Sequence, residues 1–223
     1  MRKKGICFLL FFCFLIIFCV GCKDSVYEIC LREVSETREN FYFVRNENFI
    51  ATFTSGKREK DYVLNGKHTE MVDYGVLVVD FVDKNFTTLP DFKLKIDNKI
   101  YTGIMEFNPY NGTFCVDIEA RITGGENITV FIPRLGLEDD LVFVSKMWQI
   151  DSDLAIKIAV SAFDKKIENL IVDGKLQGEI FQKLLSRNRR SAEDMFWNIC
   201  LFTKNGEILT CTIDVITGQI VAM

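Results

Sequence analysis

The chain has 223 residues, of which 48% are hydrophobic and 26% are charged, and its formal net charge is −4. This balance is that of an ordinary globular protein, without internal repeats or low-complexity segments. Nucleic-acid binding usually requires a basic domain, and the one basic cluster, at 187–190, is followed by Glu193 and Asp194, so that class is excluded. Twenty Phe and only three Pro favour a fold rich in strands.

The amino terminus has the layout of a secretory signal. Three cations at 2–4 precede an uncharged apolar run at 6–20, and Gly21 and Cys22 lead into a polar segment. The residues Cys19-Val20-Gly21-Cys22 resemble the lipobox of bacterial lipoproteins, although that family usually has Leu where Cys19 stands. The resemblance implies that residues 1–21 are a signal peptide and that Cys22, the first mature residue, carries a diacylglyceryl group.

The signal also predicts where the protein acts. Two or more acyl chains hold a protein stably on a bilayer, so we expect a lipid anchor on the extracytoplasmic face of the cell membrane. The alternative is an uncleaved membrane anchor, because the apolar run is near the shortest length that spans a bilayer. Both interpretations place residues 23–223 outside the cytoplasm.

Alternating apolar and polar residues with turn signals predict a β-rich domain over residues 22–146 and no strong helix there. The segment 41–56 indicates strand, turn, strand. Further strands are expected at 74–83, 113–122 and 128–132, and a hairpin at 92–107 turns at Asp97-Asn98, with another Asn-Gly turn signal inside 62–71. The pattern is typical of an antiparallel β-sandwich or barrel.

The pattern changes near Trp148, and residues 147–223 predict a smaller α+β domain. Asp151 or Ser152 can cap a helix that has alanines on one face over 154–162. Four strands are expected at 179–186, 195–202, 207–214 and 219–223. The first of these could instead continue a helix. The unit is therefore one helix against three or four antiparallel strands.

This second unit resembles the PepSY domain, a module of secreted and membrane-attached bacterial proteins. The similarity lies in the helix start IDSDLAIKIAVSAF and in FWNICLFTKNGEILTCTIDVITGQIVAM, with Trp197, Gly206, Asp214 and Thr217-Gly218 at the family's positions. A long middle segment, 165–178, departs from the family. The resemblance implies a module that acts by binding, with restraint of a peptidase as one such role, and that has no catalytic residues of its own. From the residues alone, Trp197 is a core residue, and Asp214 and Gly218 serve a turn.

Besides Cys22, the lipidation candidate, four cysteines follow the signal: Cys30, Cys115, Cys200 and Cys211. In an oxidising compartment they permit two disulfides. A two-residue turn at Asn205-Gly206 would place Cys200 directly opposite Cys211, at a Cα separation of about 4.5–5.5 Å that a disulfide accepts. The sequence leaves a Cys200–Cys211 disulfide and two reduced thiols equally open. Cys30 and Cys115 are expected in strands.

Catalytic motifs are few. His68 is the only histidine, and no nucleophile elbow or cluster of zinc ligands accompanies it. The acidic runs Glu138-Asp139-Asp140 and Glu193-Asp194 could hold Ca²⁺, but such runs in loops are usually solvated. We therefore predict no catalytic residue, no metal and no cofactor.

The resulting hypothesis is a membrane-anchored lipoprotein of binding or regulatory type, which is not an enzyme. Its partner would be a protein or peptide, such as a restrained peptidase, or an envelope component. The alternative is an envelope hydrolase or metal-dependent enzyme with a site between the two domains. A pocket that gathers His68 with two carboxylates would favour that enzyme, and an open sheet edge or exposed apolar patch would favour binding. A purely structural envelope component would show neither.

Overall fold

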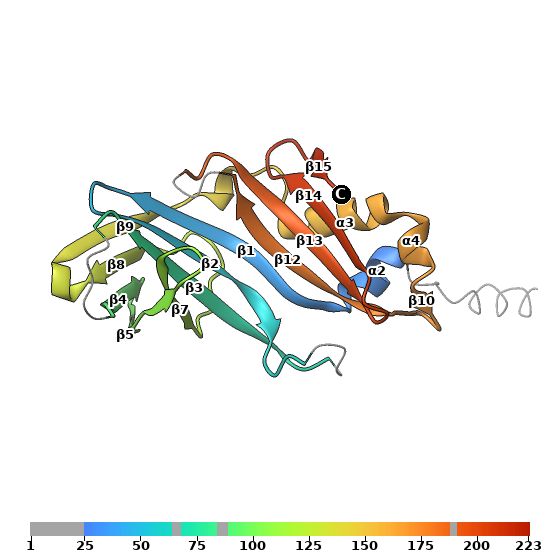
Figure 1. Ribbon diagram of the computed structural model, residues 1–223, viewed down its shortest axis with the longest axis horizontal. Coiled ribbons are helices and arrows are strands. Elements are labelled where there is room, and N and C mark those ends of the chain that lie inside the picture. Colours follow the sequence, from blue (N-terminus) through green and yellow to red (C-terminus); the bar gives the residue numbers. More distant parts are fainter. Residues whose placement is uncertain (1–24, 64–67, 84–88, 188–190) are drawn as a thin grey trace, which may run out of the picture.

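The computed structural model describes residues 25–63, 68–83, 89–187 and 191–223. The protein is mainly β. Among these residues thirteen strands form one sheet, with the main order β15-β14-β13-β12-β1-β2-β3-β7-β6 and with β4, β5, β8 and β9 off this path. Figure 1 shows the long strands running through the middle of the molecule, with α2, α3 and α4 gathered at one end.

The first part of the chain follows the predicted strands closely. Its elements are α2 (Val26–Leu31), β1 (Val34–Arg45), β2 (Phe49–Glu59), β3 (Met71–Phe81), β4 (Asp91–Ile96), β5 (Lys99–Ile104), β6 (Glu106–Asn108), β7 (Thr113–Ile118), β8 (Ile128–Ile132), η1 (Pro133–Leu135) and β9 (Leu137–Phe143). The β1–β2 and β4–β5 hairpins are confirmed. The Asn-Gly signal at 65–66 lies outside the described residues.

Two expectations for this part are wrong. Cys30 lies in α2, not in a strand, because Ser25 and Glu28 form a reciprocal capping box that starts a helix. The acidic run at 138–140 lies in β9 rather than in a loop. One face of β9 is solvated there, so a strand tolerates these charges.

The second part of the chain contains the predicted helix and strands. Its elements are η2 (Ser145–Met147), α3 (Ser152–Phe163), α4 (Lys165–Glu168), β10 (Ile171–Val172), β11 (Lys175–Leu176), β12 (Gly178–Ser186), β13 (Met195–Thr203), β14 (Ile208–Asp214) and β15 (Ile220–Ala222). The cap is confirmed, because the Asp151 carboxylate accepts a hydrogen bond of 2.8 Å from the Leu154 N–H. The segment 179–186 is a strand, as expected.

The predicted register of the β13–β14 hairpin is wrong by one residue. Cys200 pairs with Thr210, and Cys211 pairs with Ile199. The loop has three residues rather than two, because the Gly206 N–H donates to the Thr203 carbonyl and Gly206 takes a φ of 86°, which gives a type I turn with a bulge. Because side chains alternate between the two faces of a sheet, this one-residue shift places the Cys200 and Cys211 side chains on opposite faces.

Two hydrophobic cores lie on this sheet, and β1 belongs to both. Tyr42 packs with Phe53, Leu77 and other residues of the β layers, whereas its neighbour Phe41 packs into the core under α3. Successive side chains of a strand point to opposite faces, so one strand serves both cores. The sheet continues across the predicted boundary at 146/147 through the parallel pairing of β1 with β12, which includes Val34 with Ile180.

Candidate ligand-binding site

A cavity of about 180 Å³ lies between the β1–β3 face and the ends of β12 and β13. Phe43, Thr52 and Val78 lie side by side on its floor, because the ladder pairs Phe43 with Thr52 and Thr52 with Val78. Leu184 and Met195 contribute the opposite wall. The cavity therefore joins the two parts of the chain that the sequence divided into domains.

The cavity exists because β12 leaves β1 soon after their pairing begins. The two strands pair only at Val34 and Glu36 of β1. Further along, the edge of β1 is taken by the segment after β9: the Val144 N–H donates to the Phe41 carbonyl, and the Phe41 N–H donates to the Ser145 hydroxyl. As a result, β12 cannot cover the later part of β1.

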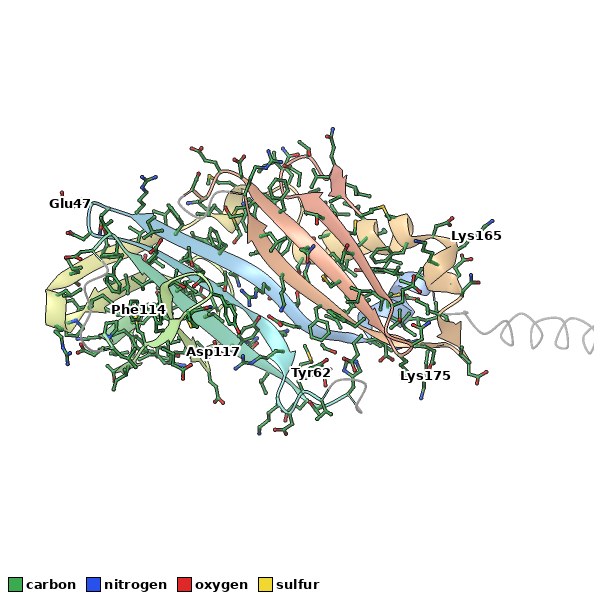
Figure 2. The ribbon with its side chains drawn as sticks, viewed as in Figure 1. Glu47, Tyr62, Phe114, Asp117, Lys165 and Lys175 are labelled. Atoms are coloured by element: carbon green, nitrogen blue, oxygen red, sulfur yellow. The ribbon has the colours of Figure 1, made fainter. Side chains whose placement is uncertain are left out.

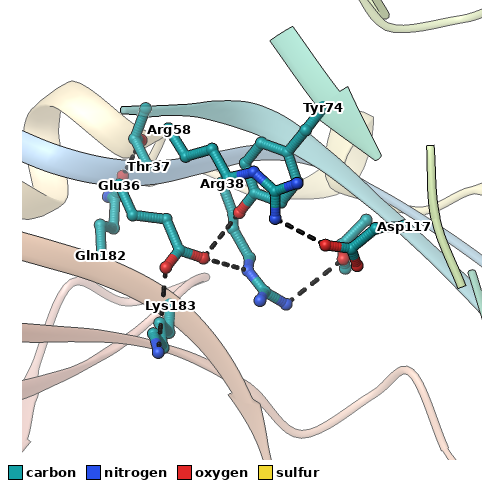
Figure 3. A network of polar contacts seen from close by, with 9 residues as sticks. Glu36, Thr37, Arg38, Arg58, Tyr74, Asp117, Gln182 and Lys183 are labelled. Carbon is teal, nitrogen blue, oxygen red and sulfur yellow. Dashed lines mark hydrogen bonds and ion pairs between the residues drawn. The ribbon is translucent and has the colours of Figure 1, made fainter. Parts of the chain in front are cut away.

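A polar network borders one end of the cavity (Figure 3). Arg38 lines the cavity and donates from Nε to the Glu36 carboxylate at 3.2 Å and from Nη1 to the Thr54 hydroxyl at 3.3 Å. The Tyr74 hydroxyl donates to the same Glu36 oxygen at 2.6 Å, and the Lys183 ammonium lies 3.9 Å from the other. One carboxylate thus holds two cations and a phenol in place.

The network also fixes the protonation states at this end. Burial is the largest cause that raises the pKa of Tyr74, and the Glu36 charge raises it further. Burial by itself lowers the pKa of Arg38, but Tyr74 and Glu36 outweigh it, so the net shift is upward. Near neutral pH, Tyr74 is therefore a neutral donor and Arg38 a cation.

Asp80 lines the far end of the cavity. It pairs with Ile50 on β2, four residues from Thr54, and strands rise about 3.3 Å per residue, so the two ends are about 13 Å apart along β2. Hydroxyl groups line the space between and around them: Thr52, Thr54, Thr113, Ser186 and Ser191. The cavity thus combines an apolar floor with scattered hydrogen-bonding groups.

The cavity suits binding of a single small group. Its volume is close to that of a cavity that holds one benzene ring, about 150 Å³, and below the range for drug-sized ligands, about 300–1,000 Å³. Among the described residues that line it there is no histidine and no cysteine. The Ser186 hydroxyl donates to the Ser191 carbonyl, and the Ser191 hydroxyl accepts from the Glu193 N–H. These contacts supply no base that would activate either serine.

His68 lies outside this cavity, next to two carboxylates that the sequence did not connect with it. Its Nδ1 is 2.8 Å from Glu59 and its Nε2 is 3.2 Å from Glu33. Glu59 also accepts a hydrogen bond of 3.0 Å from the Thr69 N–H. Each ring nitrogen of His68 faces a carboxylate. The His68 side chain therefore connects the segment before β3 with the end of β2 and with the turn before β1. A long-range pairing of this kind has no local sequence signal.

The acidic runs are held by neighbouring polar groups. Asp139 accepts a hydrogen bond of 3.0 Å from the Asn46 amide, and Asp140 accepts one of 2.6 Å from the Thr129 hydroxyl. Near the other run, the Asp194 carbonyl accepts from the Arg187 N–H. In the described part of the chain, no three His, Cys, Asp or Glu side chains are grouped so that they could hold a metal ion.

The four cysteines in the described part of the chain are free thiols. Cys200 and Cys211 lie on opposite faces of the sheet, so the candidate disulfide between them is not formed. Burial, with a smaller effect of Glu33, raises the pKa of Cys30 to about 12. Burial is also the largest cause that raises the pKa of Cys115, Cys200 and Cys211. All four are therefore protonated near neutral pH and weakly reactive.

The residues that carry the PepSY resemblance have structural roles, as their chemistry predicts. Trp197 is fully buried, and its Nε1 donates to the Ile150 carbonyl at 2.8 Å. Asp214 accepts from the Thr217 N–H at 2.7 Å, a bond that is the largest cause of its lowered pKa. Gly218 has a φ of 70°, as this turn requires.

Cys22 and the whole predicted signal, residues 1–21, lie outside the described residues. Within the described ranges, none of the helices has both the length and the apolar composition that crossing a bilayer requires. In comparisons with known proteins, no family model, no curated protein and no solved structure matches this chain.

Proposed function

We propose that this chain is an exported, lipid-anchored protein that binds a protein or peptide partner by taking one of its side chains into the cavity between β1–β3 and β12–β13. The cavity is the observation that carries the proposal. It has room for one ring-sized group, an apolar floor formed by Phe43, Thr52 and Val78, and hydroxyl groups around that floor. Buried anchor side chains in such pockets dominate many protein interfaces.

The position of the proposed anchor agrees with this arrangement. Cys22 precedes Ser25, the cap of α2, by three residues, which is at most about 11 Å of extended chain. A diacylglyceryl group on Cys22 would therefore hold the α2 end of the molecule next to the membrane. The cavity begins beyond the β1–β12 pairing, toward the other end of β1, and would face away from the lipid surface.

The PepSY-like assignment of residues 147–223 is part of the proposal. Its support is the packing of one capped helix, α3, against antiparallel strands β12 to β15. Under this assignment the partner could be a peptidase that the protein restrains, or an envelope component. The alternative, a hydrolase or metal-dependent enzyme, would use His68, which lies between Glu33 and Glu59 but does not line this cavity.

Intact mass of the membrane-fraction protein, with and without lipase treatment, tests the anchor. The expected mass is that of residues 22–223 plus acyl chains, and lipase should remove the chains. A full-length mass without lipid would contradict lipidation and support an uncleaved anchor.

Ligand-observed NMR with p-cresol, the analogue of a tyrosine side chain, tests the cavity. Small fragments bind weakly, so we expect a dissociation constant of about 1 mM for the full chain. Thr52→Leu should fill the floor and abolish the signal, whereas Thr102→Leu on β5, outside the cavity, should leave it unchanged. No p-cresol signal with the unaltered chain, or equal signals from both variants, would contradict a binding cavity.

A further inference from the structure

A second surface of the protein is an apolar groove. It lies between α3 and the edge of the sheet formed by β14 and β15. One part, lined by Leu154, Ile158 and Ile220, has about 490 Å³. The next part, of about 480 Å³, includes Ile208 and Met223. Ala162 lines both parts, so the two parts adjoin along α3 and are together called the groove.

The sheet edge beside this groove is open. β14 pairs with β13 along its whole length, from Ile208 to Asp214, but β15 covers only Thr212 and Ile213 on the other side. In the described part of the chain, residues 208–211 therefore have a strand neighbour on one side only. Figure 1 shows the short β15 at this edge of the sheet. An exposed strand edge is a template for pairing with another extended chain.

Several apolar side chains at this edge are exposed to solvent. Ile208 is 55% exposed, Ile220 is 41% and Met223 is 64%. On the helix side, Leu154 is 39% exposed. A cluster of exposed apolar residues beside an open strand edge is typical of an interaction site.

The charges at the rim indicate the chemistry of the partner. Lys157, Lys165 and Lys166 line the groove, together with a single acid, Asp164. None of the three lysines forms an ion pair with a carboxylate of the described residues. Figure 2 shows Lys165 projecting from the end of the helical layer. A positive rim favours a negatively charged partner.

We propose that this groove binds an extended acidic peptide segment of another protein, which adds a strand at the β14–β15 edge and places alternate apolar side chains against α3. From Leu154 to Ala162, α3 rises about 12 Å, the length of about four residues of extended chain. The groove continues to Lys166, so the segment is about six residues long. This surface is separate from the cavity at β1–β3.

Fluorescence anisotropy with the full chain and a labelled octapeptide of alternating Glu and Val tests this proposal. We expect this peptide to bind, and the octapeptides of alternating Lys and Val, and of alternating Glu and Gly, to bind at least about tenfold more weakly. The first control removes the charge match, and the second removes the apolar contacts. Equal affinities for all three peptides, or no binding of the Glu-Val peptide, would overturn the proposal.

Variants locate the site. The triple change Lys157→Glu, Lys165→Glu and Lys166→Glu should weaken Glu-Val binding about tenfold or more. Leu154→Ser removes an exposed contact and should weaken it without unfolding the chain, which circular dichroism checks. Lys99→Glu, on β5 at the far end of the molecule, is the matched control and should have no effect. Equal loss with Lys99→Glu would place the peptide elsewhere and overturn the assignment.

Two further measurements separate this proposal from its competitors. Sedimentation of the free chain should show a monomer, and a dimer that Leu154→Ser dissociates would mean that a second copy covers the groove, which overturns the peptide assignment. Thr52→Leu should abolish p-cresol binding and leave Glu-Val binding unchanged. The groove and the cavity can thus fail independently.

Discussion

The two hydrophobic cores of this protein differ in their residues and secondary structure, and they share one strand, β1. On one side of β1, Tyr42 packs with Phe53 and Leu77 in a core of strand and loop residues without a helix. On the other side, Phe41 joins a core in which α3 presents fully buried alanines, Ala155 and Ala159, to the sheet. Small residues let a helix approach a sheet closely, whereas large aromatic residues fill the space between β layers. The shared strand implies that the two cores unfold together.

The largest effect is expected from Trp197→Ala in the core under α3. Trp197 is fully buried, donates to the Ile150 carbonyl and packs edge-on against Trp148 at 5.5 Å. Its removal leaves a cavity and an unpaired carbonyl, so the free energy of unfolding should fall by about 3–5 kcal/mol. Urea denaturation measures this, with Phe202→Ala, a partly exposed position, as the control. A loss below about 1 kcal/mol would contradict the role of Trp197 as the core anchor.

The next effect, from Phe53→Ala in the β-layer core, tests whether the cores are coupled. Phe53 is fully buried, so the loss should be about 3–4 kcal/mol. Both tryptophans of the chain, Trp148 and Trp197, lie in or against the other core. Because β1 joins the cores, tryptophan fluorescence and far-UV circular dichroism should report the same lowered midpoint. A fluorescence midpoint that stays at its original value would show that the cores unfold separately.

A smaller, pH-dependent effect is expected at Glu126 in the β-layer region. Burial by itself raises the pKa of Glu126, but hydrogen bonds from Thr123 and from the Tyr42 hydroxyl, the latter at 2.9 Å, outweigh it and lower the pKa to about 2. A lowered folded-state pKa stabilises the protein above the unfolded value of about 4.5, and this contribution is lost as the pH falls toward 2.

The variant Glu126→Gln measures this contribution. At pH 7 it should lower the free energy of unfolding by about 1–2 kcal/mol, and the difference from the unaltered chain should shrink between pH 4.5 and pH 2. Glu138→Gln, at an exposed position of β9, is the control and should leave the free energy of unfolding at pH 7 nearly unchanged. A Glu126→Gln difference that is constant from pH 7 to pH 2 would contradict the pKa shift.

The smallest effect is expected from Cys200→Ser in the β13–β14 hairpin. Cys200 is partly exposed, its thiol donates to the Asn198 side chain at 3.0 Å, and it lies on the opposite face from Cys211. The change should cost less than about 1 kcal/mol. Stability should also be the same with and without reductant. A reductant-dependent loss in the unaltered chain that Cys200→Ser removes would mean that the two thiols do form a bond.

Local signals in the sequence were sufficient to predict most of the individual strands and the start of α3. The alternation of Phe92, Leu94 and Ile96 with lysines predicted β4, because side chains alternate across a strand. Asp151 predicted the start of α3, because its side chain satisfies a backbone N–H in the next turn. The loop of the β13–β14 hairpin was misjudged by one residue, since Asn-Gly suits both the two-residue turn and the bulged three-residue turn.

The sequence by itself determined a strand-rich chain, one capped helix, the structural roles of Trp197 and Asp214, and a signal-like amino terminus. Only the tertiary structure decided that β1 pairs with β12, that His68 meets Glu33 and Glu59, and that Phe43 and Leu184 face one cavity. These contacts join residues far apart in the chain. They depend on which strand edges meet, and the free energy of such pairing comes from the whole packed structure rather than from any local pattern.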